Sequence, residues 1–483
     1  MNLADMIIPR PKEFMEEGGL VCELEKINWI EADIVFAPAV EKINHTLREL
    51  DAGELPYYSH KMNITPRRKI LLKKSEKFAR EEYELTVKND WIEILGGDLA
   101  GVMHGAESLC QILIFSSQYG GLNRTIPVGK IHDWPRFPYR GIMVDSARHF
   151  QKKEKILEIL EEMSRYKLNI FHWHLTDRQS WRLPLSFAPE LTGNVPHSRA
   201  YSYGAYTFEE IREIREYAEA RGIEIIPELE MPGHSNSVFY THKELACQTG
   251  EDPYDADYWE FCLGNEEVKV FLRKVLEEMV KLFPNSPVFH IGGDEADTAH
   301  WEKCPFCQEK MRTLGTEDPR ILEADFMAEM EKILLSLGRK GMTWGKHHGD
   351  YKLFSDDMII QNWLSEDVST LLTTGKKIVN SFHSKCYFDY PANDCGSDPG
   401  FWQRNIYEFD PASNAGQELQ KNLLGGEGCL WTEQIPQWRL MPRLLPRMRA
   451  LSETLWCLPE EKDYRDFLER EMILCNTSCY RYR

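Results

Sequence analysis

The spacing of hydrophobic and polar positions differs between the first part of the chain and the rest. The alternation at residues 83–87 predicts a half-buried strand, and residues 91–95 predict its returning neighbour. Residues 29–36 predict a further strand, whereas residues 100–115 repeat apolar positions at helical spacing. We therefore expect a small mixed α/β domain over residues 1–133, which we interpret as a structural module.

Two prolines interrupt both patterns at residues 133–138, and we expect a linker there. Beyond it, short apolar runs alternate with amphipathic helical stretches, one of which begins with a capping box at Thr207 and Glu210. Eight strand–helix units over residues 138–483 predict a closed (β/α)8 TIM barrel, with a doubly wound open sheet as the alternative. The eight apolar runs are residues 141–144, 169–175, 223–229, 288–291, 341–344, 358–363, 377–382 and 423–431.

Composition narrows the class of protein. The 483 residues carry a net charge of −19, which argues against nucleic acid as the main partner, because phosphate binding needs a basic face. No apolar run has the length of a membrane span, and no basic-then-apolar leader is visible. Together with twelve cysteines, this pattern predicts a cytoplasmic protein with reduced thiols. We expect no membrane partner and a monomer or homodimer.

Polar and aromatic residues follow nearly every predicted barrel strand, which is where barrel enzymes build their sites. Tryptophans stack on the apolar face of a pyranose, while carboxylates and arginine bind its hydroxyls, so the set suggests a sugar site. The residues are Asp145, Arg148, His172, His174, Asp177, Glu228, Glu230, His234, Asp294, Glu295, Trp344, Trp363, Tyr387, Asp389, Trp431 and Glu433.

The adjacent carboxylates Asp294 and Glu295 follow the fourth predicted strand and two glycines. Neighbouring side chains at a strand end point in different directions, so the pair is poorly placed to flank a glycosidic bond from opposite faces. An arrangement in which one carboxylate is the acid, and the other holds a substrate group that attacks, fits better.

The stretch 290–295 (HIGGDE) resembles the signature of glycoside hydrolase family 20, the β-N-acetylhexosaminidases. The resemblance covers nearly the whole chain, including the small α/β domain that precedes the barrel in this family. Four further motifs match in order: residues 140–148 (RGIMVDSAR), 171–177 (FHWHLTD), 231–234 (MPGH) and 430–433 (LWTE).

The resemblance implies a retaining exo-glycosidase that hydrolyses terminal non-reducing β-linked GlcNAc or GalNAc from oligosaccharides or glycoconjugates, without a cofactor. In this mechanism the substrate's 2-acetamido oxygen attacks the anomeric carbon and gives an oxazolinium intermediate. Glu295 is expected to protonate the leaving group and then activate water, with its pKa raised by the neighbouring charge of Asp294. Asp294 would accept from the acetamide N–H, and Tyr387 would hydrogen-bond the acetamide oxygen.

The same resemblance implies how the sugar is held. Trp344, Trp363 and Trp431 would wall the acetamide pocket, while Arg148 and Glu433 would bind sugar hydroxyls.

Further positions complete the expected site, and some depart from the family pattern. Asp389 would hold another hydroxyl, and Asp177 and His234 would support the acid pair. Glu230 stands where the family usually has Asp, and residues 177–181 lack a second acidic residue and a glycine common there. Because neither departure affects the acid pair, we still expect hydrolytic activity, but the exact glycan specificity does not follow from the resemblance.

Three alternatives stay open. A hexosaminidase of narrower glycan specificity, or a carbohydrate-binding protein on an inactive fold of this type, would share these residues. A metal hydrolase could use His172 and His174, although no further metal-binding set accompanies them, and we expect no metal in the reaction. Four cysteines could form a zinc site if their loops meet, but free thiols are the favoured interpretation: Cys247, Cys262, Cys304 and Cys307.

Overall fold

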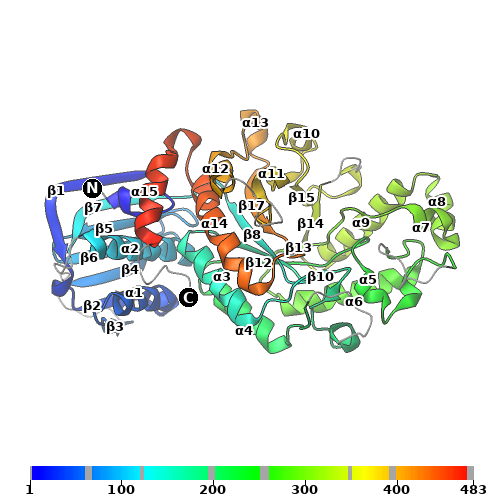
Figure 1. Ribbon diagram of the computed structural model, residues 1–483, viewed down its shortest axis with the longest axis horizontal. Helices are drawn as coiled ribbons and strands as arrows, with labels where there is room; N and C mark the ends of the chain where they lie inside the picture. The colour runs from blue at the N-terminus through cyan, green and yellow to red at the C-terminus, as the bar shows by residue number, and fades with distance from the viewer. Residues whose placement is uncertain are drawn as a thin grey trace.

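The computed structural model describes residues 3–59, 68–119, 125–193, 202–250, 260–345, 351–390 and 399–475. Over these ranges the chain forms a sheet domain, at the left of Figure 1, and a closed barrel ringed by helices, at its right. The helical face of the first part lies toward the barrel, so the two units pack side by side (Figure 1).

The N-terminal sheet is mixed, and both strands of its predicted hairpin are confirmed. Tyr83–Lys88 and Trp91–Gly96 pair antiparallel, with Lys88 opposite Trp91. The strand expected over 29–36 is correct only in its first half, because Ile34–Phe36 forms a 3-10 turn that leads into α1 (Ala37–Glu49). In spatial order the strands are β1 (Glu13–Glu23), β7 (Thr125–Asp133), β5 (Tyr83–Lys88), β6 (Trp91–Gly96), β4 (Lys69–Lys74), β2 (Trp29–Ala32) and β3 (Tyr57–Tyr58).

The predicted helix over residues 100–115 is confirmed as α2 (Leu99–Tyr119). Its stretch Leu99–Gln118 is, among the described helices, the one that is long and apolar enough to cross a membrane. However, 89% of that apolar window is buried inside the protein. Because α2 packs against α1, β5 and β6, its apolar composition is accounted for by the core of the small domain.

The barrel closes as predicted, and all eight predicted strands are confirmed. The last strand pairs parallel with the first, with Leu430 opposite Val144, which excludes the open-sheet alternative. A layer of apolar side chains fills the barrel near the start of the strands, so the interior is a core and not a pore. The strands are β8 (Tyr139–Asp145), β9 (Ile170–His174), β12 (Glu224–Glu228), β13 (Val288–His290), β14 (Lys340–Trp344), β15 (Ile359–Asn362), β16 (Lys377–Asn380) and β17 (Leu423–Leu430).

One helix between the strands, α4 (Phe208–Glu219), begins where the sequence places its cap. At the start of α4, the Glu210 amide donates to Thr207 Oγ1 at 3.1 Å and the Thr207 amide donates to Glu210 Oε2 at 2.9 Å, which completes the expected capping box. A short hairpin of β10 (Thr176–Asp177) and β11 (Ser180–Trp181) follows β9. The described barrel helices are α3 (Lys153–Arg165), α4 (Phe208–Glu219), α5 (Asn236–Phe239), α6 (Glu266–Leu282), α7 (Ala299–Lys303), α8 (Pro305–Leu314), α9 (Pro319–Ser336), α10 (Ser369–Leu372), α11 (His383–Cys386), α12 (Pro399–Glu408), α13 (Gln417–Gln420) and α14 (Leu440–Trp456).

The last helix, α15 (Tyr464–Cys475), was not predicted, and it contacts the N-terminal domain, where it is drawn in red in Figure 1. Its Arg470 donates to the backbone oxygen of Ile7 at 2.6 Å and to Glu453 Oε1 on α14 at 2.7 Å. The segment 138–483, expected as one barrel, therefore includes a helix that joins the two units.

Candidate active site

A pocket of about 370 Å³ opens at the C-terminal ends of the barrel strands. Nine of the eleven residues expected at the site line it, and the other two, Trp344 and Asp177, lie buried next to lining residues. The lining consists of Arg148, His234, Asp294, Glu295, Trp363, Tyr387, Asp389, Tyr390, Trp431, Glu433, Gln434 and Ile435.

The turn that carries the two carboxylates requires both preceding glycines. Gly292 has φ +64° and Gly293 has φ +104°, values that L side chains rarely adopt. A Cβ at Gly292 would also collide with Glu230 Oε2, and one at Gly293 with Thr343 Oγ1. Glu295 itself has φ +46°, so the backbone is strained at the acid. Close packing between neighbouring strands therefore sets the direction of the carboxylate pair.

Asp294 lines the pocket and has one oxygen without a hydrogen-bond partner among the described residues. Its side chain is only 14% exposed, and this oxygen, Oδ1, is buried. Burial raises the pKa of Asp294, the charge of His234 lowers it, and the carboxylates of Glu228 and Glu295 raise it further. A buried acceptor without a donor is costly, so this oxygen is poised to accept a hydrogen bond from a bound molecule.

Glu295 is more open, with a side chain that is 56% exposed, and its Oε2 lies 3.5 Å from His234 Nε2. The hydrogen bond from His234 lowers the pKa of Glu295, an effect that burial only partly offsets. Burial lowers the pKa of His234, but the carboxylates of Asp177 and Asp294 outweigh it and raise that pKa to about 10. The net pKa of Glu295 is therefore lowered in this geometry, although we expected a raised pKa, because a charged histidine contacts the acid directly.

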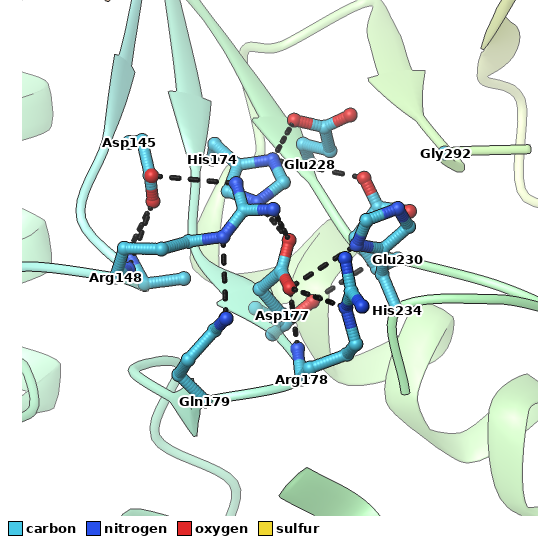
Figure 2. Close-up of polar contacts among 12 residues, drawn as sticks. Asp145, Arg148, His174, Asp177, Arg178, Gln179, Glu228, Glu230, His234 and Gly292 are labelled. Atoms are coloured by element: carbon cyan, nitrogen blue, oxygen red, sulfur yellow. Dashed lines mark hydrogen bonds and ion pairs between the residues drawn. The ribbon is translucent and has the colours of Figure 1, made fainter. Parts of the chain in front are cut away.

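Asp177 is the centre of the polar contacts drawn in Figure 2. Its carboxylate lies 2.8 Å from Arg148 Nη2, 3.0 Å from His174 Nε2 and 3.2 Å from His234 Nδ1. Burial raises the pKa of Asp177, but Arg148 and His234 hold it well below its usual range. One ionised carboxylate thus orients both a cation of the pocket wall and the histidine beside Glu295. The structure places the expected supports, Asp177 and His234, next to the acid pair.

Arg148 extends from the end of β8 across the pocket mouth. Besides Asp177, it lies 3.3 Å from Asp145 Oδ2 and 3.7 Å from Glu433 Oε1, and its guanidinium is 5.0 Å from the ring centroid of Trp431. These contacts fix a donor group beside an aromatic wall, an arrangement suited to a polyhydroxylated ring.

Three tryptophans and a tyrosine form an aromatic box that includes the ring beside Arg148. The ring of Trp431 lies 5.8 Å from that of Trp344 and 6.0 Å from that of Tyr387. Trp344 Nε1 donates to Glu228 Oε1 at 2.7 Å, and Trp363 Nε1 donates to the backbone oxygen of Gly345 at 2.9 Å. The indole N–H groups of Trp344 and Trp363 are thus satisfied within the protein, and the rings of Trp363 and Trp431 line the pocket with Trp344 buried next to Trp431.

Asp389 and Tyr390 close the pocket on the β16 side. Burial raises the pKa of Asp389 to about 7, and its Oδ1 has no hydrogen-bond partner among the described residues. The ring of Tyr390 lies 5.6 Å from that of Tyr387. The sequence prediction missed Tyr390, although its place directly after the motif 387–389 is a signal that could have found it.

Below the pocket, the histidines of the His-x-His pair are held by carboxylates. His172 lies 2.9 Å from Glu427 Oε1 through Nδ1 and 3.2 Å from Glu228 Oε2 through Nε2. His174 contacts Glu228 and Asp177 in the same way. Their ring nitrogens are therefore engaged in a buried ionic network that supports the pocket floor.

Glu230, which departs from the family pattern, lies against the turn at Gly292. Burial raises its pKa well above the usual range, and the charges of Asp294 and Glu228 raise it further. Its Oε2 has no partner among the described residues. The longer side chain thus places a buried carboxyl group of raised pKa against the turn that carries the acid pair.

Comparison with known proteins agrees with this geometry. Residues 137–459 match the catalytic domain of glycosyl hydrolase family 20, and residues 5–134 match domain 2 of the same family. A beta-hexosaminidase of Akkermansia muciniphila is 30% identical over 80% of this chain and 81% of its own length. One from Porphyromonas gingivalis is 31% identical over 81% of this chain, which spans only 52% of that longer protein.

A solved structure extends the match to nearly the whole chain. The exo-β-N-acetylglucosaminidase of Vibrio harveyi, crystallised with N-acetylglucosamine, superposes with a TM-score of 0.86 at 27% identity. The alignment covers 99% of this chain and 78% of that one. Two family models, relatives at about 30% identity and a pocket built from the same motifs agree, and the chain belongs to glycosyl hydrolase family 20 as a glycoside hydrolase.

Proposed function

We propose that the protein is a retaining exo-β-N-acetylhexosaminidase that removes terminal non-reducing GlcNAc or GalNAc from oligosaccharides or glycoconjugates. The volume of the pocket, about 370 Å³, suits a single terminal sugar. The names of the relatives support this substrate class.

The observation that carries the proposal is the unpartnered Asp294 Oδ1 beside an aromatic box. A 2-acetamido group has one N–H donor, one carbonyl acceptor and one methyl group. Asp294 would accept from the N–H, the Tyr387 hydroxyl would donate to the carbonyl oxygen, and the faces of Trp363 and Trp431 would cover the methyl. A sugar with a plain 2-hydroxyl would leave the box empty.

The reaction would use the acetamide as its own nucleophile. Glu295 gives its proton to the glycosidic oxygen as the C1–O bond breaks, and the acetamide oxygen bonds to C1. Asp294 stabilises the positive charge on the resulting oxazolinium. Glu295 then takes a proton from water, whose oxygen attacks C1 as the bond between C1 and the acetamide oxygen breaks, which restores the β-configuration and the 2-acetamido group. Since Glu295 is half exposed and ionised beside His234, a bound sugar must exclude water from it and raise its pKa.

Turnover of aryl β-N-acetylglucosaminide and β-N-acetylgalactosaminide tests the proposal. We expect wild-type protein to release the aryl group and Glu295→Gln to lose on the order of 10²–10⁴-fold in kcat, which is the usual contribution of a general acid. A thiazoline mimic of the oxazolinium should inhibit strongly, while aryl β-glucoside should be almost inert. Efficient glucoside turnover would refute the mechanism.

A hexosaminidase of narrower glycan specificity is the alternative within this class, and the same assay decides between the two. A strong preference for one of the two aryl substrates would identify such an enzyme.

We also propose a reducing, cytoplasmic location. None of the ten cysteines in the described ranges forms a disulfide, which supports this location. A fluorescent fusion to either end of the full chain tests this location, and a monomer or homodimer remains our prediction for sedimentation analysis.

A further inference from the structure

Four buried cysteines gather away from the pocket, and the reaction uses none of them. Their exposed fractions are 3% for Cys247 and 0% for Cys262, Cys304 and Cys307. Cys247 follows the 3-10 turn Lys243–Leu245, and Cys304 and Cys307 lie at the start of α8. Three segments that are distant in sequence therefore meet at one cluster of sulfur atoms.

The distances between the sulfur atoms do not describe disulfides. They are 3.6 Å from Cys262 to Cys304, 3.7 Å from Cys262 to Cys307 and 3.8 Å from Cys247 to Cys307, and all four atoms lie within 4.8 Å of one another. A disulfide joins its sulfurs at about 2.05 Å, and it would single out one partner for each cysteine. Here Cys262 and Cys307 each have two neighbours at nearly equal distance.

A tetrahedral metal site has this spacing. Zinc binds thiolate sulfur at about 2.3 Å, which sets the edges of a regular tetrahedron at about 3.8 Å. An iron–sulfur cluster would spread its four ligands much farther, because inorganic iron and sulfide fill the space between them.

The backbone presents the cysteines in two pairs. The amide of Cys262 donates to the backbone oxygen of Leu245 at 3.0 Å, and Ala246 and Phe261 form an isolated antiparallel bridge, so Cys247 and Cys262 are brought together by backbone pairing.

The second pair is preorganised by a helix start. Cys304 is the N-cap residue of α8, Pro305 begins the helix and Cys307 follows in its first turn. At this spacing both sulfurs face the same side. Core packing alone could bury four small cysteine side chains. It would not require that a strand bridge and the first turn of a helix bring all four thiols to one point.

We propose that Cys247, Cys262, Cys304 and Cys307 bind one Zn²⁺ ion in a four-thiolate structural site. Thiolates in tetrahedral geometry select zinc, and four protein ligands leave no coordination position for water or substrate. The site therefore adds stability and not chemistry. The earlier preference for free thiols is reversed by the sulfur geometry.

The zinc site holds the loops that carry the catalytic residues. Between Cys247 and Cys262, the amide of Phe261 donates to the Pro232 backbone oxygen at 3.0 Å, two residues before His234. Phe261 in turn accepts from Trp301 Nε1 at 3.0 Å. The segment is thus fixed between the loop after β12 and helix α7, which follows the loop after β13.

Glu260 adds a direct link to the acid loop. Its Oε1 accepts from the amide of Asp297 at 3.1 Å, two residues after Glu295, and its Oε2 lies 3.1 Å from His300 Nδ1. Loss of the ion would free Cys262, and with it the neighbouring Phe261 and Glu260, from α8. We expect the position of Glu295 to become less defined, so the cysteines act as positioning residues.

Metal analysis of the purified full chain is the direct test. Wild-type protein should carry one equivalent of zinc, and Cys262→Ser and Cys304→Ser should lose it together with a lowered Tm. Cys110→Ser, which alters a buried thiol on α2 outside the cluster, should keep the full equivalent. Zinc-free wild-type protein from zinc-supplemented growth, or full zinc in Cys262→Ser, would overturn the proposal. Iron in place of zinc would overturn the identity of the ion.

Cobalt substitution in wild-type protein is a second test, which does not depend on whether the cysteine variants fold. After chelation, wild-type protein should bind Co²⁺ with the intense visible absorption of tetrahedral thiolate coordination, and one equivalent of Zn²⁺ should displace it. Chelation should lower Tm, and Zn²⁺ but not Mg²⁺ should restore it. Weak octahedral cobalt absorption, or a Tm unaffected by chelation that demonstrably removes the metal, would contradict the structural site.

Discussion

At the scale of single residues, the charge on His234 controls the proton affinity of Glu295. Replacing His234 with Gln removes the cation and the hydrogen bond that lowers the pKa of Glu295. The acid would then keep its proton to higher pH in the free enzyme. We expect the alkaline limb of the pH profile of kcat/KM to move to higher pH, even though the maximum falls. An unshifted or lowered limb would show that His234 does not tune the acid.

The pH dependence of Tm gives an independent measure of the pKa of His234. The folded pKa of about 10 lies above the ordinary histidine value of 6.5, so the charged form stabilises the fold fully below pH 6.5. That contribution is lost as pH rises toward 10. The Tm advantage of wild type over His234→Gln should therefore shrink between these values.

At the scale of elements, the turn after β13 depends on close packing as well as on backbone freedom. Gly292→Ala would suffer both a positive φ and a collision with Glu230, whereas Gly338→Ala has φ +74° and open space around its Cβ. We expect about 1–2 kcal/mol of destabilisation at Gly338 and more at Gly292, with a large loss of kcat only at Gly292. Urea unfolding and turnover of the aryl substrate measure the two effects. Equal losses in both variants would mean that the collision is relieved without moving the acid pair.

The properties of single elements also explain which parts of the fold and the site the sequence could predict. Barrel strands are short apolar runs bounded by polar residues, so all eight were found, and the chemistry at their ends followed from the order of the motifs. Strand β1 was missed because every position in it except Cys22 is exposed, which removes the alternation that marks a strand. The lowered pKa of Glu295 depends on a contact with His234, 61 positions away in the chain, and no local pattern encodes that distance.

At the scale of the whole molecule, the two units share a buried ionic contact. Arg140, at the start of the barrel, reaches Glu81 in the N-terminal domain at 2.5 Å, and Asn169 donates to the other oxygen of Glu81 at 2.8 Å. Arg140 is fully buried and Glu81 is 3% exposed. A buried pair of this kind costs about 3–5 kcal/mol when one partner is removed, because the other charge is left uncompensated. The units should therefore be coupled in unfolding.

Urea unfolding of Glu81→Gln tests this coupling. Wild-type protein should unfold in one transition, which far-ultraviolet circular dichroism and loss of activity should report at the same urea concentration. The variant should unfold at a lower urea concentration. Burial raises the pKa of Glu81, but Arg140 outweighs it and lowers that pKa below 4.5, so the stabilisation is present above pH 4.5 and is lost as pH falls further. The difference in unfolding free energy between wild type and Glu81→Gln should therefore shrink in acid.

The control is Glu23→Gln, which removes an exposed ion pair with Lys26 and should change the free energy of unfolding by no more than about 1 kcal/mol. Two separate transitions in wild-type protein would show that the domains are stable independently and that the Arg140–Glu81 contact only docks them.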